Sequence, residues 1–194
     1  MNEIREPLSA ADAAHFNALL RGRRTVHDFL PDPVPQDVLD RALEAARWAP
    51  NHHRTEPWRF YLLGARARAL LTERNTELVR AKKGERAAEV KLARWRAVPH
   101  WLLLTMVVDA DEGRAREDYA ACCCAAQNLM LALWAEGIGS KWTTGAVTRD
   151  AETLRALGID PAVERVVGLF WYGVPANVLE QQRRPLEQCV RALP

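Results

Sequence analysis

Three short segments of the chain hold the side chains whose types and spacing could do chemistry. In the first, Arg23, Arg24 and Thr25 stand side by side in a short extended stretch. Two guanidiniums and a hydroxyl so close together suit a phosphate, because arginine offers a planar fork of donors to an anion. A solvated basic loop is the alternative, and these three residues alone slightly favour it.

The second segment, Asn51-His52-His53, brings two imidazoles next to each other in a polar loop. Neighbouring positions do not face each other on a helix, and no third ligand is evident, so we predict no metal site here. A histidine in a polar loop is usually a surface residue that makes hydrogen bonds. The alternative use is a contact with the polar edge of a ring.

The third segment is S-K-W-T-T-G over residues 140–145, directly after the glycines of G-I-G. Glycine lets the backbone approach a ligand closely, and Trp142 with Thr143 and Thr144 would supply a flat wall and donors. By itself the segment is equally an ordinary strand of alternating polarity. No Ser-His-Asp order, pair of acids or G-x-S-x-G motif is persuasive, and the phosphate-loop glycine motifs are absent from the sequence.

Apolar periodicity predicts the elements that must position these segments. The predicted helices run from a Ser9 cap to Gly22, from Gln36 to Trp48, over 65–97 with a break near Gly84, from Glu117 to Glu136, and for a short stretch from Thr148. The predicted strands are Trp58–Leu63, Trp101–Val108, Ser140–Val147 and Val166–Tyr172. This order predicts a mixed sheet with helices packed on it.

Length, composition and charge bound the class of protein. The 194 residues suit a single domain. Apolar residues make up 48% of the chain, which excludes disorder as the global state. The net charge of +2 gives no global reason to expect nucleic acid or a membrane as partner. Six basic and two acidic residues lie between Lys82 and Arg96, and we expect a solvated face there.

The longest uncharged run covers residues 119–135. It falls short of the roughly 20 apolar residues that span a bilayer, so we predict a helix buried on nearly every face. We expect Leu129 and Leu133 on a side of it that a partner covers. The first residues lack the apolar stretch of a signal peptide, which predicts a cytoplasmic protein. The cysteines (Cys122, Cys123, Cys124 and Cys189) are expected to be small core residues in a reducing cytosol.

Four segments together resemble the nitroreductase family of flavin enzymes. The stretch RRTVHDFLPDPVPQDVLDRALEAARWAPNHHRTEPWRFYLL resembles the opening of that family, with its double basic start, proline-rich turn and Pro-Trp before a strand. EGIGSKWTTGA, VVGLFWYGVP and RRPLEQCV are similar to later segments of the family, in the same order. Each segment is weak alone, but four in sequence are specific and cover nearly the whole chain. The chain looks most like short members with a histidine in the Pro-Trp loop.

The resemblance implies an α+β fold: a mixed, mainly antiparallel sheet in α/β/α layers, with residues 1–194 as one nitroreductase-like domain. It implies a homodimer with FMN at the subunit interface, and a tail from about residue 175 that packs on the partner. The implied activity is NAD(P)H-dependent reduction of nitroaromatic, quinone or similar flat acceptors by a ping-pong mechanism. Because flavin N5 would carry the hydride, no protein residue is expected to be catalytic.

The resemblance also assigns candidate site residues. Those expected at the flavin, including the arginines for its phosphate, are Arg23, Arg24, Thr25, His27, Trp48, His52, Trp142, Thr143, Thr144 and Arg183. Those in a stretch associated with the nicotinamide nucleotide are Ala132, Leu133, Trp134, Ala135, Glu136 and Gly137. His27 stands where many members have another basic residue, and Glu56 stands where an amide is usual.

Two other functions remain open at this point. One is a flavin-binding protein of the same fold with a role in flavin storage or breakdown, which turnover of NAD(P)H with an acceptor would distinguish. The other is a nucleic-acid-binding domain that uses Lys82–Arg96 and the Arg23–Arg24 loop. That domain would be colourless, and its binding would depend steeply on salt.

Overall fold

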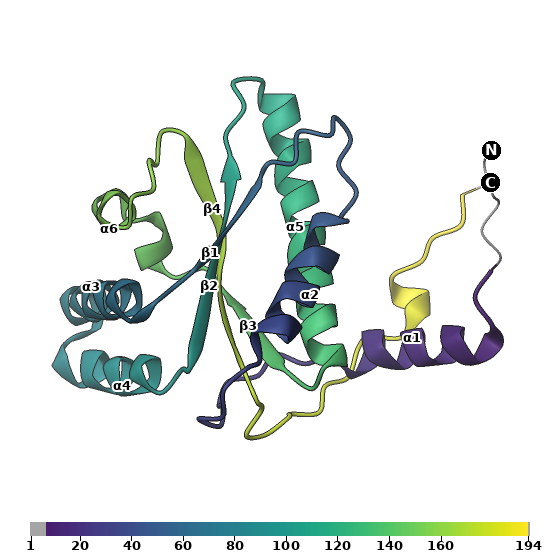
Figure 1. The fold of residues 1–194 in the computed structure, drawn as a ribbon, viewed down its shortest axis with the longest axis horizontal. Coiled ribbons are helices and arrows are strands. Elements are labelled where there is room, and N and C mark those ends of the chain that lie inside the picture. The colour runs from purple at the N-terminus through teal and green to yellow at the C-terminus, as the bar shows by residue number, and fades with distance from the viewer. Residues whose placement is uncertain (1–6, 194) are drawn as a thin grey trace.

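Four strands form one sheet within residues 7–193, the part of the chain that the computed structural model describes (Figure 1). They are β1 (Trp58–Leu62), β2 (His100–Val107), β3 (Gly139–Thr143) and β4 (Glu164–Gly173), in the spatial order β1-β2-β4-β3. Each pair of neighbouring strands is antiparallel. The expected mainly antiparallel sheet is therefore confirmed, and a single parallel bridge from Thr25 to Ser140 extends it.

The central strands β2 and β4 are buried on both faces. Leu102 and Leu104 of β2 pack into the core on one side of the sheet, and Trp101 and Leu103 pack into the core on the other. A strand with apolar groups on both faces reads as a continuous apolar run, because neither set of alternating side chains meets water. This is why the sequence shows an apolar run from Trp101 to Val108 that only Thr105 interrupts.

Helices cover both faces of the sheet (Figure 1). One layer consists of α2 (Gln36–Arg47) and α5 (Glu112–Ala135), and the other consists of α3 (Ala65–Lys83), α4 (Glu85–Arg96) and α6 (Ala151–Ala156). The break between α3 and α4 falls at Gly84, whose φ of 83° suits glycine best. The expected α/β/α layers are confirmed.

Two boundaries differ most from the sequence prediction, and the others agree within three residues. Helix α5 begins at Glu112, five residues before Glu117, because Asp111 caps it by accepting a hydrogen bond from the Arg114 N–H at 2.7 Å. Strand β3 ends at Thr143, and Val147 lies instead in the short helix η1 (Ala146–Arg149). Val147 is fully buried in the second core, and the turn into η1 is what brings it there.

Helix α5, which contains the uncharged run 119–135, is buried on one face only. Leu129 and Leu133 lie on that face and are each 1% exposed, so the expectation that a partner covers them is wrong. Eight residues of α5 are buried, and they repeat every three or four positions, as one helix face does. The residues that stay uncovered within one chain include Tyr119, Cys124 and Gln127.

The cysteines do not all lie in the core. Cys122 is fully buried, and burial raises the pKa of its thiol to about 12. Cys123 is half-buried, while Cys124 and Cys189 are exposed. The expectation of four core cysteines therefore holds only for Cys122, because three consecutive positions on a helix point in three different directions. All four thiols are free.

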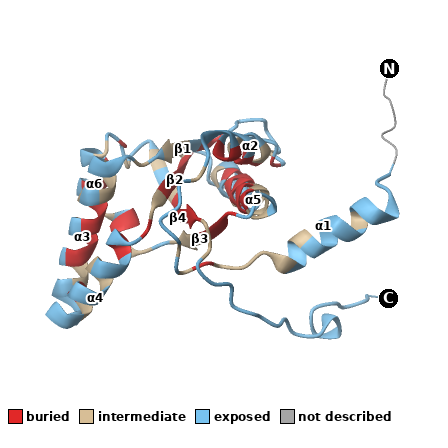
Figure 2. Ribbon diagram, turned by 60° about the horizontal axis from the view of Figure 1, so that its bottom comes forward, coloured by how far each residue is buried: buried red, intermediate tan, exposed pale blue. Residues whose placement is uncertain are grey.

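Helix α1 (Ala10–Gly22) and the chain after β4 project away from the layered body (Figure 2). Ser9 caps α1 as expected, accepting a hydrogen bond from the Asp12 N–H at 3.1 Å. No residue of α1 is buried. The tail, which includes the short helix η2 (Leu186–Gln188), is exposed from Ala176 to Leu193. Within the described residues, none of the helices has the length and apolar character needed to cross a bilayer.

Candidate functional site

Arg23, Arg24 and Thr25 form the connection from α1 to the edge of the sheet. Arg23 follows the last turn of α1, and Thr25 forms the parallel bridge to Ser140 at the start of β3. The backbone N–H of Val26 donates to the Ser140 carbonyl at 3.0 Å, which fixes the segment beside β3. The hydroxyl of Ser140 is buried there without a hydrogen-bond partner among the described residues.

Arg183 from the tail comes close to this segment. Burial lowers the pKa of Arg23, and the charges of Arg183 and Arg24 lower it further. Within residues 7–193, none of these three arginines forms an ion pair with a carboxylate. The structure thus brings together three guanidiniums that the sequence separates by up to 160 positions, in an arrangement that suits a multiply charged anion.

A second group of basic side chains lies on the side of β3 that faces α4. Lys141 Nζ is 3.2 Å from His27 Nδ1 and sits over the Trp171 ring, 4.8 Å from its centroid. Burial lowers the pKa of Lys141, and the charges of Arg94 and Lys91 on α4 add to this effect. The pKa of His27 is lowered by burial, then by Lys141 and Arg94.

Lys141 and Arg94 are site residues that the sequence prediction missed. The signal for Lys141 was a charged residue in the middle of a short strand, between Ser140 and Trp142. Arg94 had no such signal, because it lies in a stretch that was expected to be a solvated face. Only the packing of α4 against the sheet brings its charge near β3.

Trp142 is largely engaged within the sheet. Its indole N–H donates to the Val167 carbonyl at 3.1 Å, and its ring lies 5.3 Å from that of Phe170. Gly168 makes this possible, because a Cβ at that position would lie 2.1 Å from the indole nitrogen. Thr143 is half-buried like Trp142, and Thr144 is exposed.

A cleft of about 830 Å³ opens beside Thr144. Its walls mix apolar and polar groups: Val108, Tyr119, Thr148, Arg149, Leu154, Pro161, Ala162, Glu164, Arg165, Val166 and Val167. Glu164 is held in place by the Tyr61 hydroxyl, which donates to it at 2.8 Å, and by Thr105. A cleft of this size can hold a small aromatic molecule.

Trp48 and His52, which were also expected at the flavin, lie far from the Arg23 segment in the structure. Trp48 is 74% exposed and donates its indole N–H to Glu44 at 2.7 Å. His52 contacts Glu117 near the start of α5, whereas the Arg23 segment lies near the end of α5, where Gly22 approaches Trp134. Helix geometry puts about 27 Å between Glu117 and Ala135. One chain therefore does not bring these two expected flavin contacts to the arginines.

The stretch proposed for the nicotinamide nucleotide is the last turn of α5 and its end. Leu133 is buried in the core, and Glu136 pairs with Arg41 at 2.8 Å. Ala132 and Trp134 are half-buried, while Ala135 is exposed. Gly137 has a φ of 78° and ends the helix. The accessible part of this stretch is therefore its backbone end rather than all of its side chains.

Comparison with known proteins shows the family to which this architecture belongs. A model described as the nitroreductase family matches residues 20–174. The chain belongs to the nitroreductase family. YfhC of Bacillus subtilis (strain 168), which carries the provisional name NAD(P)H nitroreductase, is 35% identical over 172 residues, covering 86% of this chain and 87% of YfhC.

Solved structures of nitroreductases share the fold. A nitroreductase-like family protein from Bacillus cereus superposes with a TM-score of 0.80 at 27% identity, covering 98% of this chain and 99% of that chain. NfnB of Mycobacterium smegmatis, an FMN-dependent nitroreductase solved in complex with NADPH, gives a TM-score of 0.73 at 24% identity. This superposition covers 96% of this chain and all of NfnB.

Proposed function

We propose that this nitroreductase family member is an FMN-dependent oxidoreductase that uses NADH or NADPH to reduce a flat acceptor such as a nitroaromatic or a quinone. One observation carries the proposal: the charges of Arg24 and Arg183 act on Arg23 beside the start of β3, and none of the three arginines pairs with a carboxylate among the described residues. The chain's membership of the nitroreductase family supports the same assignment. So does the similarity to NfnB, which is FMN-dependent and was solved in complex with NADPH.

The three arginines fit the phosphate of FMN. A phosphate carries nearly two negative charges, and each charge-assisted hydrogen bond contributes about 1.5–3 kcal/mol. The buried hydroxyl of Ser140 and the hydroxyl of Thr25 lie beside them and can add neutral donors. The same residues would be an unfavourable grouping in a protein that binds no anion there, because like charges repel.

The rest of the site has roles that follow from its position. Lys141 and His27 form a further basic pair at β3, on the side that faces α4. Thr144 lies where this edge of the sheet opens into the 830 Å³ cleft, which would admit the acceptor. The bound flavin supplies the hydride chemistry, and the protein positions it and the two substrates.

The proposed assembly is a homodimer in which each site uses both chains. Trp48 and His52 lie too far from the arginines of their own chain to share one flavin with them. The projecting segments at the two ends of the chain (Figure 2) offer exposed apolar residues to a second copy: Leu8, Phe16, Leu20, Val178, Leu179, Leu186 and Val190. The uncovered face of α5 adds Tyr119. So many exposed apolar side chains on projecting segments are typical of a partner surface.

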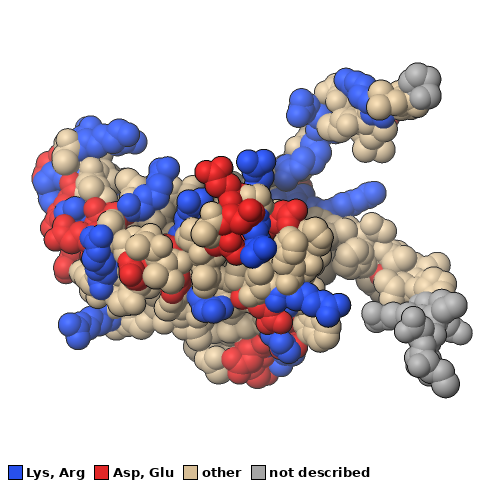
Figure 3. All heavy atoms as spheres, turned by 90° about the horizontal axis from the view of Figure 1, so that it is seen from above, with Lys and Arg blue, Asp and Glu red and all other residues tan. Residues whose placement is uncertain are grey.

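Surface charge gives no support to nucleic acid binding. On the face drawn in Figure 3, acidic and basic side chains are interspersed over the body of the molecule. A nucleic-acid surface instead gathers basic residues into a continuous patch. The basic stretch 82–96 also contributes Trp95 and Ala88 to the interior, so it is an amphipathic helix rather than a basic arm.

An absorption spectrum followed by steady-state kinetics tests the proposal. The purified protein should be yellow and oxidise NADH or NADPH only when a nitroaromatic or quinone is present. Initial rates at varied concentrations of both substrates should give parallel double-reciprocal lines. Yellow protein that fails to turn over either nucleotide with any such acceptor would favour the storage or breakdown role. Colourless protein that binds no added FMN would refute the proposal.

A further inference from the structure

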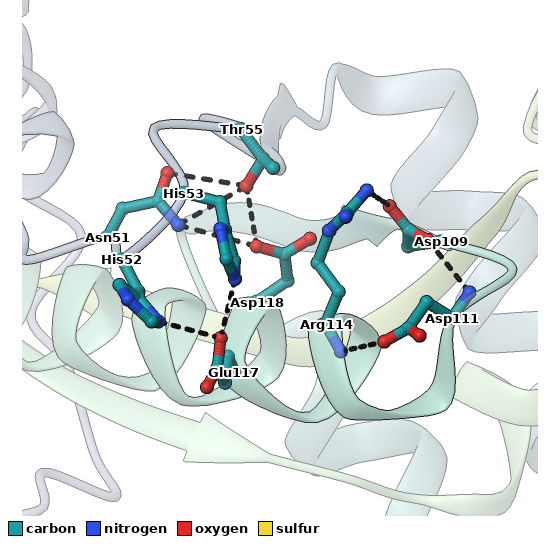
Figure 4. A network of polar contacts seen from close by, with 9 residues as sticks. All are labelled: Asn51, His52, His53, Thr55, Asp109, Asp111, Arg114, Glu117 and Asp118. Carbon is teal, nitrogen blue, oxygen red and sulfur yellow. Dashed lines mark hydrogen bonds and ion pairs between the residues drawn. The ribbon is translucent and has the colours of Figure 1, made fainter.

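The loop after α2 and the start of α5 bring three potential metal ligands together (Figure 4). His52 Nδ1 lies 3.0 Å from Glu117 Oε2, and His53 Nε2 lies 3.1 Å from the same oxygen. All three ligand atoms lie within 4.8 Å of one another. We propose that His52, His53 and Glu117 form a binding site for a divalent transition-metal ion such as Zn²⁺.

The spacing of the ligand atoms fits such an ion. Zinc binds imidazole nitrogen and carboxylate oxygen at about 2.0–2.2 Å, which places the ligands of a tetrahedral site about 3.3–3.5 Å apart. The two nitrogen-to-oxygen distances are already within about 0.5 Å of that spacing. The rings of His52 and His53 lie 4.2 Å apart, and small rotations of both side chains would admit the ion.

The ligand types favour a transition metal over Mg²⁺ or Ca²⁺. Imidazole suits Zn²⁺, Cu²⁺ and Ni²⁺, whereas Mg²⁺ and Ca²⁺ prefer oxygen ligands throughout. Three protein ligands leave a fourth position for water or another molecule. The side chains of His52, His53 and Glu117 are 71%, 42% and 47% exposed, so an ion can enter directly from solvent.

The loop is fixed on α5 by contacts that do not involve the three ligands. Asn51 Oδ1 accepts a hydrogen bond from the Glu56 N–H at 2.8 Å, and the Thr55 hydroxyl donates to Asp118 at 2.5 Å. Asp118 is 2% exposed and also accepts from Asn51 (Figure 4). A loop anchored in this way holds its histidines near Glu117 before an ion arrives, which lowers the ordering cost of binding.

Charge around the site favours a cation. A metal ion binds histidine in its neutral form, so the two imidazoles and one carboxylate would present it with a charge of about −1. Asp118 places a second carboxylate behind them, in the interior. Arg114, one of two arginines in the first turns of α5, is paired with Asp109 at 3.2 Å (Figure 4).

The sequence alone did not reveal Glu117 as a third ligand for the two histidines. Glu117 lies 64 positions after His53 and meets it only because α5 runs antiparallel to α2, so that its first turns reach the loop. The site does not depend on the flavin. The metal site uses Nδ1 of His52. Nε2, on the opposite side of the ring, stays free for the contact with the flavin of the second chain in the proposed homodimer.

A zinc titration of the full-length, tag-free protein with its flavin bound tests the site. Competition with a chromophoric zinc chelator should show one equivalent of Zn²⁺ per chain. His53→Ala and Glu117→Gln should each weaken binding by about tenfold or more. Zinc should raise the melting temperature of the parent protein but not that of either variant.

Matched controls make the result specific. His15→Ala and Glu112→Gln remove the same residue types from exposed positions outside the cluster, and zinc binding should not change. Flavin content and circular dichroism confirm that each variant is folded. Absence of a stoichiometric zinc site, or binding that both cluster variants retain, would overturn the proposal, whatever the outcome for the flavin.

Discussion

Arg23 stands in an electrostatic position that folding makes unfavourable. Its pKa is lowered by burial and by the approach of Arg183 and Arg24, so the folded protein pays a cost in repulsion between like charges. An anion bound among the three guanidiniums would remove that cost. Binding of FMN should therefore depend strongly on each arginine and weaken as ionic strength rises.

Arg23→Ala should weaken FMN binding by about 1.5–3 kcal/mol, or roughly 10- to 150-fold, the contribution of one charge-assisted contact. Thr25→Ala should cost less, because a hydroxyl donates a neutral hydrogen bond. Flavin fluorescence during titration of flavin-free protein measures both. Arg21→Ala, which removes an exposed arginine from the last turn of α1, is the control. Unchanged affinity in Arg23→Ala would show that the phosphate binds elsewhere.

At the scale of elements, short caps hold the segments that border the cleft. Asp150 lies between η1 and α6, accepts a hydrogen bond from the Thr153 N–H at 3.1 Å, and receives two further bonds from Arg74 of α3. Chiefly through Arg74, these contacts lower the pKa of Asp150 to about 2. One carboxylate thus caps α6 and ties it to α3.

Asp150→Ala should lower the free energy of unfolding by about 1–2 kcal/mol at pH 7, because it removes a helix cap and an ion pair that solvent partly screens. A lowered pKa stabilises the fold above the ordinary value of 3.8, and this effect disappears as pH falls towards 2. Denaturant unfolding at several pH values should therefore show the two proteins converging below about pH 4. Glu152→Ala, at an 88% exposed position, should change little. A difference that stays undiminished at pH 2 would contradict the role assigned to the ionised carboxylate.

The two faces of α5 should have different roles. The buried face is needed for one chain to fold, and the uncovered face is needed for it to associate with a second chain. Cys124→Arg places a charge on the uncovered face of α5, so the chain should fold but remain a monomer without flavin. A charge buried unpaired in an interface costs several kcal/mol. Leu129→Arg, on the buried face, should instead prevent folding. Size-exclusion chromatography read at the protein and flavin bands distinguishes these outcomes.

Val90→Arg on α4 is the control for that experiment, because Val90 is 67% exposed and lies on the opposite layer. It should leave a yellow dimer. A folded Cys124→Arg monomer that still holds one FMN per chain would contradict a site shared between subunits.

At the scale of the whole molecule, the chain consists of a layered body and two projecting segments (Figure 2). The body contains both hydrophobic cores. The tail carries Arg183 together with a series of exposed apolar side chains. Burial of those side chains against a second chain would therefore also fix Arg183 beside Arg23 and Arg24. A partner that covers the tail would hold Arg183 in place.

Leu179→Asp and Leu186→Asp should each weaken the dimer, since burying a leucine contributes about 1.5–3 kcal/mol. These residues are 59% and 71% exposed in one chain, so its fold should survive. Sedimentation velocity should show dissociation, with loss of flavin in the same samples. Gln188→Asp adds the same charge to η2 without removing an apolar group and should remain a dimer. Stable yellow dimers of both leucine variants would show that the tail does not contact a partner.

Much of the fold was readable from local pattern. The apolar period of 3.6 located α2, the Ser9 cap located α1, and Gly84 located the break between α3 and α4. A continuous apolar run located β2. These features are local because helix and strand periods, caps and glycine conformations depend on residues within a few positions of one another.

The candidate site was readable only in part. The family segments named the arginines and Thr144, because such motifs survive as short strings. Lys141 and Arg94 were missed as a pair, since their interaction depends on how α4 packs against the sheet. Glu117 could not be matched to the two histidines, because the antiparallel packing of α2 on α5 sets that contact.

The sequence by itself therefore determined which elements form, their order and the family to which the chain belongs. Only the tertiary structure decided that Leu129 faces inward, that Arg183 approaches Arg23, and that His52 lies at the far end of α5 from both. The physical reason is that periodicity specifies an apolar face but not the surface it meets. Contacts between distant segments are selected by packing of the whole core, which no short stretch of sequence contains.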